Sequence, residues 1–546
     1  MKKLLFLFSL LILMLPLAIK AQVTLVKDIN PGADNSLNQF PRTPCGCLND
    51  LYFFHADDGI HGQELWISDG TENGTFMLND INPGDASTTI SQPFLVDDII
   101  YFTANTPGFG VEPWRSDGTI EGTYLLKDVN PGTASSFAND FVAFNGKVYF
   151  PASSEEYGRE FWLTDGTEAG TELAFELVPG SDNSGPVHVN VFQDQLYFWS
   201  NHEFSSGRFY RSDGTVDNTI AIASIKPGQN QVDIPAIFIH NDLMYFAADS
   251  DETDTEPWRS DGTAEGTFLL KDIDLANPNT PWTGSSYPRS FHSFQGNVYF
   301  GANNAFWRTD GTTTGTQKIG DMNLSPTISI PYRHIASNDN HMFFFGDMNT
   351  DDHLWRSDGT IAGTVIADEG VSAFFGLEPT DFVEKNNIIY FLADTKDYGR
   401  EVAFTLGELS DLQVVADIQA GEEDSNPFCL RICGDRLFFY ADDGTHGSEL
   451  FTSDVLTSTK EIHQNERLGL QAQPNPINHE LSIQLDPIFN GKDIHYQIIN
   501  SIGQSIRSGQ ETTTHFMLNT TDLKTGIYFI QVVVEEEYGI LKVVKQ

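Results

Sequence analysis

The chain is 546 residues long, and its 76 acidic residues against 31 Lys and Arg give a formal net charge of −45. That length exceeds one compact core and predicts several domains or a repeat array, while an aromatic content of 12% is typical of a folded chain. The charge argues against nucleic acid or an anionic membrane as a partner, because an acidic body is repelled by both.

The N-terminus has the features of a secretory signal peptide. Two lysines precede an apolar run over residues 4–15, and the small residue Ala21 offers a cleavage site. We therefore predict a signal peptide over residues 1–21. A retained membrane anchor is the less favoured alternative, because the run is short and Pro16 interrupts it. No other stretch reaches spanning length, so the mature chain is expected to lack a transmembrane segment.

One phrase recurs along the chain. "GQELWISDGTENGT" at 62–75 returns as "GVEPWRSDGTIEGT" at 110–123, and nine copies follow one another at steps of 48 residues, with one step of 49. Their central position holds Trp66, Trp114, Trp162, Tyr210, Trp258, Trp307, Trp355, Ala403 and Phe451. Three residues later come Asp69, Asp117, Asp165, Asp213, Asp261, Asp310, Asp358, Leu406 and Asp454. Repeats of this length indicate a propeller or a solenoid.

Each unit reads as one four-stranded antiparallel sheet. In one copy the β-type runs cover 123–129, 141–145, 147–152 and 160–165, with turn residues between them. The third run is apolar at successive positions, which requires cover on both faces, as in stacked propeller blades. We expect the Asp-Gly steps to be structural turns and the tryptophan to fill the gap against the next blade.

The fold class predicted is all-β: a propeller-like array of nine four-stranded repeats over 22–463, a linker over 464–472 and a small β-sandwich over 473–546. The run "TLVKDI" at 24–29 could complete the last blade and close the ring. Nine blades exceed the usual four to eight. An eight-bladed ring with one displaced unit therefore stays open as an alternative.

The repeat resembles a known family. "ELWISDGT", with "HADDGIHG" before it and "LNDINPG" after it, is similar to the ELWxxDGT-repeat proteins secreted by bacteria, and the likeness covers residues 23–457. The unit at 398–409 departs from the pattern by losing both its Trp and its Asp. This resemblance implies an architecture and no particular activity.

The C-terminal domain resembles the sorting domain of type IX secretion (Por) in Gram-negative bacteria. The residues that carry the likeness are Pro474, Asn475, Pro476, Gly503, Gly526, Ile527, Tyr528 and Lys542. The resemblance implies the type IX machinery as a partner and a secreted or outer-surface destination after periplasmic transit. A ligand-binding β module is the alternative.

Acidic residues recur beside the central aromatic position. Glutamate stands two residues before it at Glu64, Glu112, Glu160, Glu256, Glu401 and Glu449. With Asp57, Asp58, Asp442 and Asp443 these carboxylates could bind calcium, but the absence of EF-hand-like spacing favours hairpin and cap bonding. His61 and His446 lack partners at zinc-ligand spacing. We predict no cofactor and no metal, with structural calcium as the weaker alternative.

No sequence motif identifies a catalytic site. We find no nucleophile elbow, phosphate-binding loop or metalloprotease motif, so we assign no catalytic residue. The sequence therefore favours a binding or adhesion module over an enzyme. A hydrolase or lyase acting on polysaccharide, and a purely structural surface component, are the alternatives.

The sixth unit carries the candidate ligand loop. Its loop "DLANPNTPWTGSSYPRSF" is six residues longer than usual, and its later hairpin is five residues shorter. The loop holds Trp282, Tyr287 and Arg289, two rings and a cation suited to stacking on a sugar or a peptide of a surface protein. The alternative is that Trp282 folds onto its own blade.

The four cysteines occur as two pairs at opposite ends of the array. Cys45 and Cys47 lie in the first unit, and Cys429 and Cys433 lie in the ninth. An extended segment 429–433 would separate its ends by about 13 Å, beyond the roughly 7 Å limit for a disulfide. We predict at least one disulfide between the two pairs, which closes a ring. A local turn that joins Cys429 to Cys433 is the main competitor.

Overall fold

The computed structural model describes most of the chain. The described residues are 23–37, 45–91, 93–200, 208–227, 237–250, 253–274, 284–303, 305–321, 335–348, 351–367, 371–372, 382–395, 398–407, 413–456, 470–473, 477, 479–500, 505–524, 526–534 and 537–545. The expected signal peptide lies outside them. The chain forms two compact units, one of residues 1–385 and 389–455 and one of residues 386–388 and 456–546.

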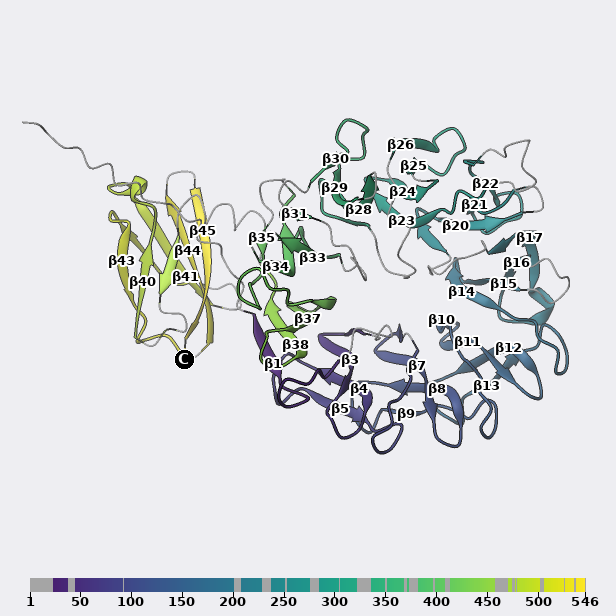
Figure 1. The fold of residues 1–546 in the computed structure, drawn as a ribbon. Coiled ribbons are helices and arrows are strands. Elements are labelled where there is room, and N and C mark those ends of the chain that lie inside the picture. Colours follow the sequence, from purple (N-terminus) through teal and green to yellow (C-terminus); the bar gives the residue numbers. More distant parts are fainter. Residues whose placement is uncertain are drawn as a thin grey trace, which may run out of the picture. The chain divides into compact units, whose positions relative to one another are not determined.

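The first unit is all-β and consists, within the described residues, of nine antiparallel sheets in succession (Figure 1). The first four sheets contain β2 (Cys45–Leu48), β3 (Leu51–Asp57), β4 (Gln63–Ser68), β5 (Phe76–Asn79); β6 (Phe94–Val96), β7 (Ile99–Thr106), β8 (Gly110–Ser116), β9 (Tyr124–Leu125); β10 (Val142–Phe144), β11 (Lys147–Ser154), β12 (Gly158–Thr164), β13 (Glu172–Phe175); and β14 (Val187–Phe192), β15 (Gln195–Ser200), β16 (Arg208–Ser212), β17 (Ile220–Ala223). A 3₁₀ turn, η1 (Val216–Asn218), precedes β17.

The next four sheets repeat the order with longer loops. They contain β18 (Lys226–Pro227), β19 (Phe238–His240), β20 (Leu243–Asp249), β21 (Glu256–Ser260), β22 (Phe268–Leu269); β23 (Arg289–Phe294), β24 (Asn297–Ala302), β25 (Ala305–Thr309), β26 (Gln317–Asp321); β27 (Ile335–Ser337), β28 (Met342–Met348), β29 (Asp351–Ser357), β30 (Val365–Ile366); and β31 (Val371–Ser372), β32 (Val383–Lys385), β33 (Ile388–Thr395), β34 (Gly399–Thr405), β35 (Gln413–Val414). The ninth contains β36 (Phe428–Cys433), β37 (Arg436–Asp442), β38 (Ser448–Asp454) and β1 (Thr24–Lys27).

The third sheet shows how the sequence builds each unit. Asn145 and Gly146, with φ of 51° and 72°, form a two-residue turn between β10 and β11, and such turns need residues that tolerate positive φ. Along β11, residues 148–152 are all buried, because both faces of the strand are covered. The outermost strand β13 is only four residues long, and its pairing with β12 is interrupted by a bulge between Phe161 and Trp162.

Apolar clusters join each sheet to its neighbour. Such a cluster spans each of the first seven boundaries between successive sheets, and β32 contacts β36 at the eighth. The aromatic residue of the repeat packs toward the preceding sheet. Trp162, for example, shares a cluster with Val96 and Tyr101 of the second sheet, and Lys27 of β1 lies 5.7 Å from the Trp66 ring centroid. The expectation that the tryptophan packs against the next blade was therefore wrong in direction.

The N-terminal strand completes the last sheet. Thr24 and Leu25 of β1 pair with Thr452 and Phe451 of β38, so segments more than 400 residues apart lie side by side (Figure 1). A further apolar cluster then joins this ninth sheet to the first. In it the ring of Tyr52 stacks on Phe438, with centroids 5.1 Å apart. The series of sheet contacts thus returns to its start.

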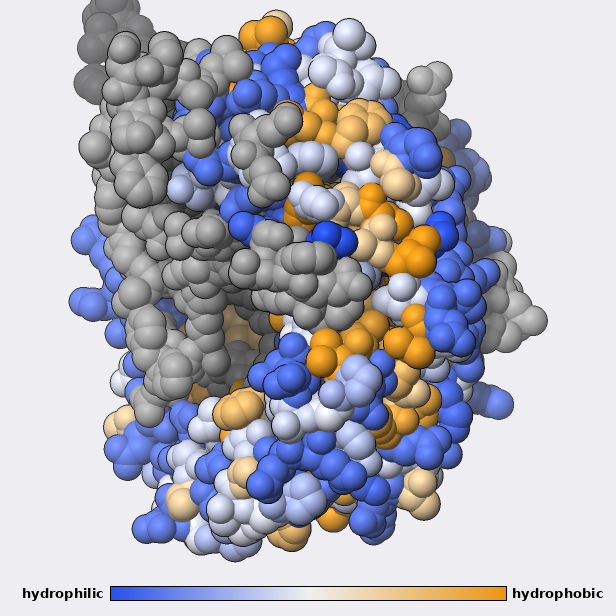
Figure 2. Space-filling model, turned by 90° about the vertical axis from the view of Figure 1, so that its right-hand side faces the viewer, coloured by the Kyte–Doolittle hydropathy of each residue, from blue (hydrophilic) through white to orange (hydrophobic). Residues whose placement is uncertain are grey.

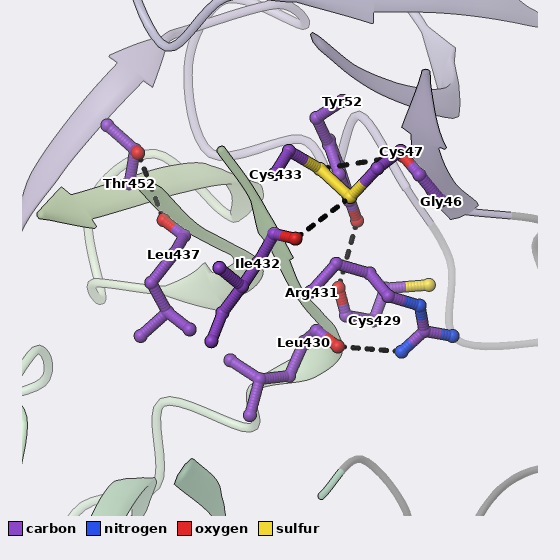
Figure 3. Close-up of a disulfide and its surroundings, with 10 residues drawn as sticks. All are labelled: Gly46, Cys47, Tyr52, Cys429, Leu430, Arg431, Ile432, Cys433, Leu437 and Thr452. Atoms are coloured by element: carbon purple, nitrogen blue, oxygen red, sulfur yellow. Dashed lines mark hydrogen bonds between the residues drawn. A yellow bond between two sulfur atoms is a disulfide. The ribbon is translucent and has the colours of Figure 1, made fainter. Parts of the chain in front are cut away.

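Two disulfides bridge the same boundary. Cys45 is bonded to Cys429, with a Cα–Cα distance of 6.1 Å. Cys47 is bonded to Cys433, with a Cα–Cα distance of 5.4 Å (Figure 3). The Tyr52 hydroxyl donates a hydrogen bond to the Cys429 carbonyl at 2.9 Å. The predicted link between the two cysteine pairs is confirmed, and the local Cys429–Cys433 alternative is wrong because each cysteine faces the strand of the other sheet.

One face of the first unit carries both hydrophilic and apolar residues (Figure 2). Figure 2 shows the side on which β12, β13, β16 and β17 lie in Figure 1, where apolar side chains gather among polar ones. Of the seven apolar residues in β13 and β17, five are buried or partly buried, whereas Ile220, at 45% exposure, and Ala221 are exposed. Short, bulged outer strands such as β13 and β17 offer little edge for pairing with another chain.

The second unit is a sandwich of two sheets. One contains β39 (Gln471–Gln473), β40 (Glu480–Gln484) and β43 (His515–Asn519), and the other contains β41 (Ile494–Asn500), β42 (Ser505–Glu511), β44 (Gly526–Val534) and β45 (Glu537–Lys545). A 3₁₀ turn, η3 (Pro487–Phe489), follows β40. The sheets share one core, in which Ile483 and Phe516 of the first lie with Ile498 and Ile530 of the second.

We predict that the two disulfides stabilise the fold non-additively. Each closes a loop of more than 380 residues, but once one bridge is intact the other constrains only a short additional segment. Replacing all four cysteines by serine should lower the free energy of unfolding by about 2–5 kcal/mol. Breaking either bridge alone should cost much less than half of that loss. Equilibrium denaturation of the three variants measures these losses of unfolding free energy. If the two single-bridge losses were equal and added up to the loss in the four-cysteine variant, the non-additive stabilisation would be contradicted.

Candidate functional site

The recurring glutamates are buried supports of the loops between sheets. Glu64 accepts hydrogen bonds from the backbone N–H of Ile81 at 3.1 Å and of Asn82 at 3.2 Å, and from the Thr88 hydroxyl at 2.6 Å. Glu112 likewise accepts from the N–H groups of Val129 and Ser136. Glu160, Glu256 and Glu401 likewise accept hydrogen bonds from groups 17 to 30 residues downstream. Glu449 accepts from the N–H of Ile29, near the other end of the first unit's sequence.

These carboxyl groups have raised pKa values. Burial brings the pKa of Glu64, Glu112, Glu401 and Glu449 to about 7, although the hydrogen bonds they accept act in the opposite direction. All six glutamates are at most 1% exposed. They therefore hold the loops in place and do not form an exposed acidic rim.

The Asp-Gly phrase forms a self-bonded turn. In the second unit the Asp117 carboxylate accepts from the N–H and the hydroxyl of Thr119, at 3.1 and 2.7 Å, and the Ser116 hydroxyl accepts from the N–H of Gly118. A Cβ at Gly122 would collide with the Asp117 carboxylate, so the second glycine of the phrase is also required. The bonds from Thr119 lower the pKa of Asp117. The same carboxylate bonds recur at Asp69, Asp165, Asp213, Asp261, Asp310 and Asp358.

The weaker calcium candidates cap two hairpins. Asp58 accepts from the N–H groups of Ile60 and His61, and its other oxygen lies 2.8 Å from His61 Nδ1. The hydrogen bond to Asp58 raises the pKa of His61. Asp443 and His446 repeat this arrangement, while Asp57 and Asp442 each accept from a glycine N–H two residues on. Among the described residues no group of three or more His, Cys, Asp or Glu side chains is placed to hold a metal.

The structure places two of the three candidate ligand-loop residues. Tyr287 is 49% exposed and has a φ of 48°. It directly follows Ser286, whose hydroxyl donates to Glu256 at 2.6 Å and whose N–H donates to the Thr255 carbonyl at 3.0 Å. Arg289 begins β23 and pairs with Gly301. Trp282 lies outside the described residues.

Phe137 was missed by the sequence reasoning. It follows Ser136, which Glu112 holds just as Glu256 holds Ser286, so Phe137 and Tyr287 occupy equivalent positions. Phe137 is 61% exposed, again with a φ of 48°. The available sequence signal was the match of "SSF" at 135–137 to "SSY" at 285–287, hidden by the six-residue insertion in the sixth unit.

The sorting-motif residues of the second unit fall partly within the described chain. The Tyr528 hydroxyl donates to the Lys524 carbonyl at 3.0 Å. Gly526, Ile527 and Lys542 lie in the ladder between β44 and β45. The four remaining motif residues, Pro474, Asn475, Pro476 and Gly503, lie outside the described residues.

Comparison with known proteins identifies the second unit. Residues 471–546 match the family of secretion system C-terminal sorting domains. This match indicates export to the cell surface by type IX secretion. A search of curated proteins gave no match. Within the described residues, no helix has the length and apolar character needed to cross a membrane.

Solved structures similar to this chain share little sequence with it. PorZ, a surface component of the type IX secretion system of Porphyromonas gingivalis, has 12% identity and a TM-score of 0.32, with 92% of this chain and 75% of PorZ covered. A puromycin hydrolase has 10% identity and a TM-score of 0.34, with 64% and 58% covered. A prolyl endopeptidase has 9% identity and a TM-score of 0.35, with 93% and 55% covered. Likenesses at this level carry no argument about function.

We predict that removal of one glutamate support destabilises the first unit. Glu112→Ala leaves the buried N–H groups of Val129 and Ser136 without their acceptor, which should cost about 2–4 kcal/mol. The matched control is Glu121→Ala, since Glu121 is exposed in the adjoining turn, and it should change stability by less than about 0.5 kcal/mol. Chemical denaturation measures both. Equal effects of the two variants would refute the supporting role.

We also predict that stability falls as pH rises. Folding raises the pKa of Glu112 from 4.5 to about 7, so its stabilising contribution is fully present below about pH 4.5 and is lost as pH rises through about 7. The free energy of unfolding should therefore decline from about pH 5 to about pH 8, measured in high salt to screen the net charge. Glu112→Gln, which does not titrate, should show a shallower decline. An unchanged slope in the variant would count against this titration.

Proposed function

We propose that the chain is a binding or adhesion module of the outer cell surface, built on one closed β-propeller of nine blades. Nine successive sheets, a strand β1 that completes the ninth sheet and a cluster that joins it to the first support the closed ring. The matching sorting domain supports export by the type IX machinery. The resemblance of the repeat to the ELWxxDGT family and the sequence of residues 1–21 support the same destination.

The exposed ring of Tyr287 carries the binding proposal. The residue before it, Ser286, is anchored to two neighbouring segments. Ser286 donates hydrogen bonds to Glu256 and to the Thr255 carbonyl, and its own carbonyl accepts from the N–H of Asn303 at 2.7 Å. An exposed tyrosine ring on an anchored backbone offers contact area at a small cost in conformational entropy. Trp282 and Arg289 of the same loop add a second ring and a cation suited to a glycan or a surface protein.

The acidic side chains of the repeat support a binding role over catalysis. Glu112 and Asp117 and their counterparts are committed to bonds that hold loops and turns. Variation between units is instead concentrated in the loops between sheets, as in the lengthened loop of the sixth unit. Binding residues are commonly found on loops that a rigid scaffold positions.

We predict that changes in the sixth-unit loop reduce ligand binding. Trp282→Ala and Tyr287→Asn should each weaken binding of the full chain to its hits on an array of glycans and bacterial surface proteins, by roughly fivefold or more. Ile361→Asn is the control, since Ile361 is 70% exposed in an Asp-Gly turn at the other end of the strands. An array without hits, or hits that both loop variants retain, would refute the proposal, and turnover of a hit would favour an enzyme.

A further inference from the structure

We infer that Phe137 and Tyr287 are equivalent contact sites, three sheets apart, for a protein surface that presents lysine or arginine side chains. This inference rests on the proposed binding function and adds a second site and a ligand class. It starts from one backbone position, the residue that follows the serine or threonine held by each buried glutamate. In the described units that position is filled by Leu37, Thr89, Phe137, Gly185, Tyr287 and Asn426.

The backbone at this position favours residues without a large side chain. Four of the six residues have positive φ: 48° at Phe137, 58° at Gly185, 48° at Tyr287 and 46° at Asn426. Gly and Asn are the residues that tolerate this conformation best, whereas a bulky aromatic residue is a genuine outlier there. The two aromatic residues therefore occupy a position whose local geometry opposes them.

Core packing does not account for the two rings. Phe137 is 61% exposed and Tyr287 is 49% exposed, whereas Leu37 at the equivalent place is 1% exposed and belongs to the core. Strain that packing does not explain points to a role in recognition. Two aromatic side chains kept in solvent at a strained, firmly anchored position have the properties of ligand contacts.

The backbone that carries each ring is anchored at the same end of the strands. The Ser136 carbonyl accepts from the N–H of Ser153 at 2.8 Å, and the Ser286 carbonyl accepts from that of Asn303 at 2.7 Å. The two loops lead into the third and the sixth sheet and lie against the starts of β8 and β21. A single extended partner could therefore meet both rings on one face of the unit.

The surrounding charge selects a cationic partner. Glu155 lies beside the first loop, since its N–H donates to Asn130 at 3.0 Å, and the Asp274 carboxylate lies against Gly284 in the second. Two basic residues neighbour the rings. Arg159 is engaged with the carbonyl of Phe137 and the amide of Asn139, and Arg289, two residues after Tyr287, also has an interaction partner. The chain has a net charge of −45. An ammonium or guanidinium group is therefore attracted both by the negative potential of the chain and by the face of an aromatic ring.

A labelled hexalysine peptide tests the inference on the full chain at physiological salt, with hexaglutamine as the neutral probe. Phe137→Asn and Tyr287→Asn place a residue that the chain itself uses at Asn426, so folding should be retained and the melting temperature unchanged or raised. Each variant should weaken hexalysine binding by roughly two- to fivefold, and the double variant by more. Ile361→Asn should bind as the unaltered chain does.

Other outcomes would overturn the inference in distinguishable ways. Equal hexalysine binding by the unaltered chain and the double variant would show that net charge acts alone, and a large fall in melting temperature would make the rings structural. If the chain instead failed to bind hexalysine but bound glycans, and the ring variants lost that glycan binding, glycans would be the ligand class in place of cationic protein surfaces. The proposed binding function would then still hold. Loss at Tyr287 but not at Phe137 would remove the second site.

Discussion

A sheet whose two faces are both apolar must be covered on both sides, and this constraint shapes the whole first unit. Strands such as β11 are buried along successive residues because the sheets before and after them supply the cover. A linear stack would leave its first and last sheets each with one apolar face in water. The chain avoids this by placing the first sheet against the ninth, where Tyr52 and Phe54 lie with Phe438 and Tyr440. Strand β1 and the two disulfides then fix that boundary.

Each repeat contains structural residues and, beside them, positions that vary between units. Its buried glutamate holds the loop that leads to the next sheet, and its Asp-Gly turn closes the opposite end of the strands. Both devices are made of bonds within the chain, and they use the same residue types in most units, with glutamate in six of the nine. The side chain of the loop residue that follows the glutamate's serine or threonine partner takes no part in these bonds, and this residue varies from Leu37 through Gly185 to Phe137. The side chain there can therefore change without loss of either device.

Sequence reasoning predicted the features that depend on local pattern. The runs at 141–145, 147–152 and 160–165 share one sheet as predicted, and the link between the cysteine pairs is confirmed. The run at 123–129 was assigned to the wrong sheet: it forms β9 of the preceding sheet, and β13 is the fourth strand here. The direction in which Trp162 packs did not follow, because residue type does not say which face of a twisted sheet meets which neighbour. The burial of Glu112 was hidden because its partners lie 17 and 24 residues away. The role proposed for Phe137 rests on a backbone angle and an exposed fraction, which no sequence pattern supplies.

Peptide mapping under non-reducing conditions tests the central claim, closure of the array, most directly. Protease digestion of the secreted chain should release disulfide-linked peptides in which a segment around 45–47 is joined to a segment around 429–433. Reduction should separate each linked peptide into these two segments. Bridges found only within each pair, Cys45 to Cys47 and Cys429 to Cys433, would contradict the account, because the first and last sheets would then not be fastened to each other.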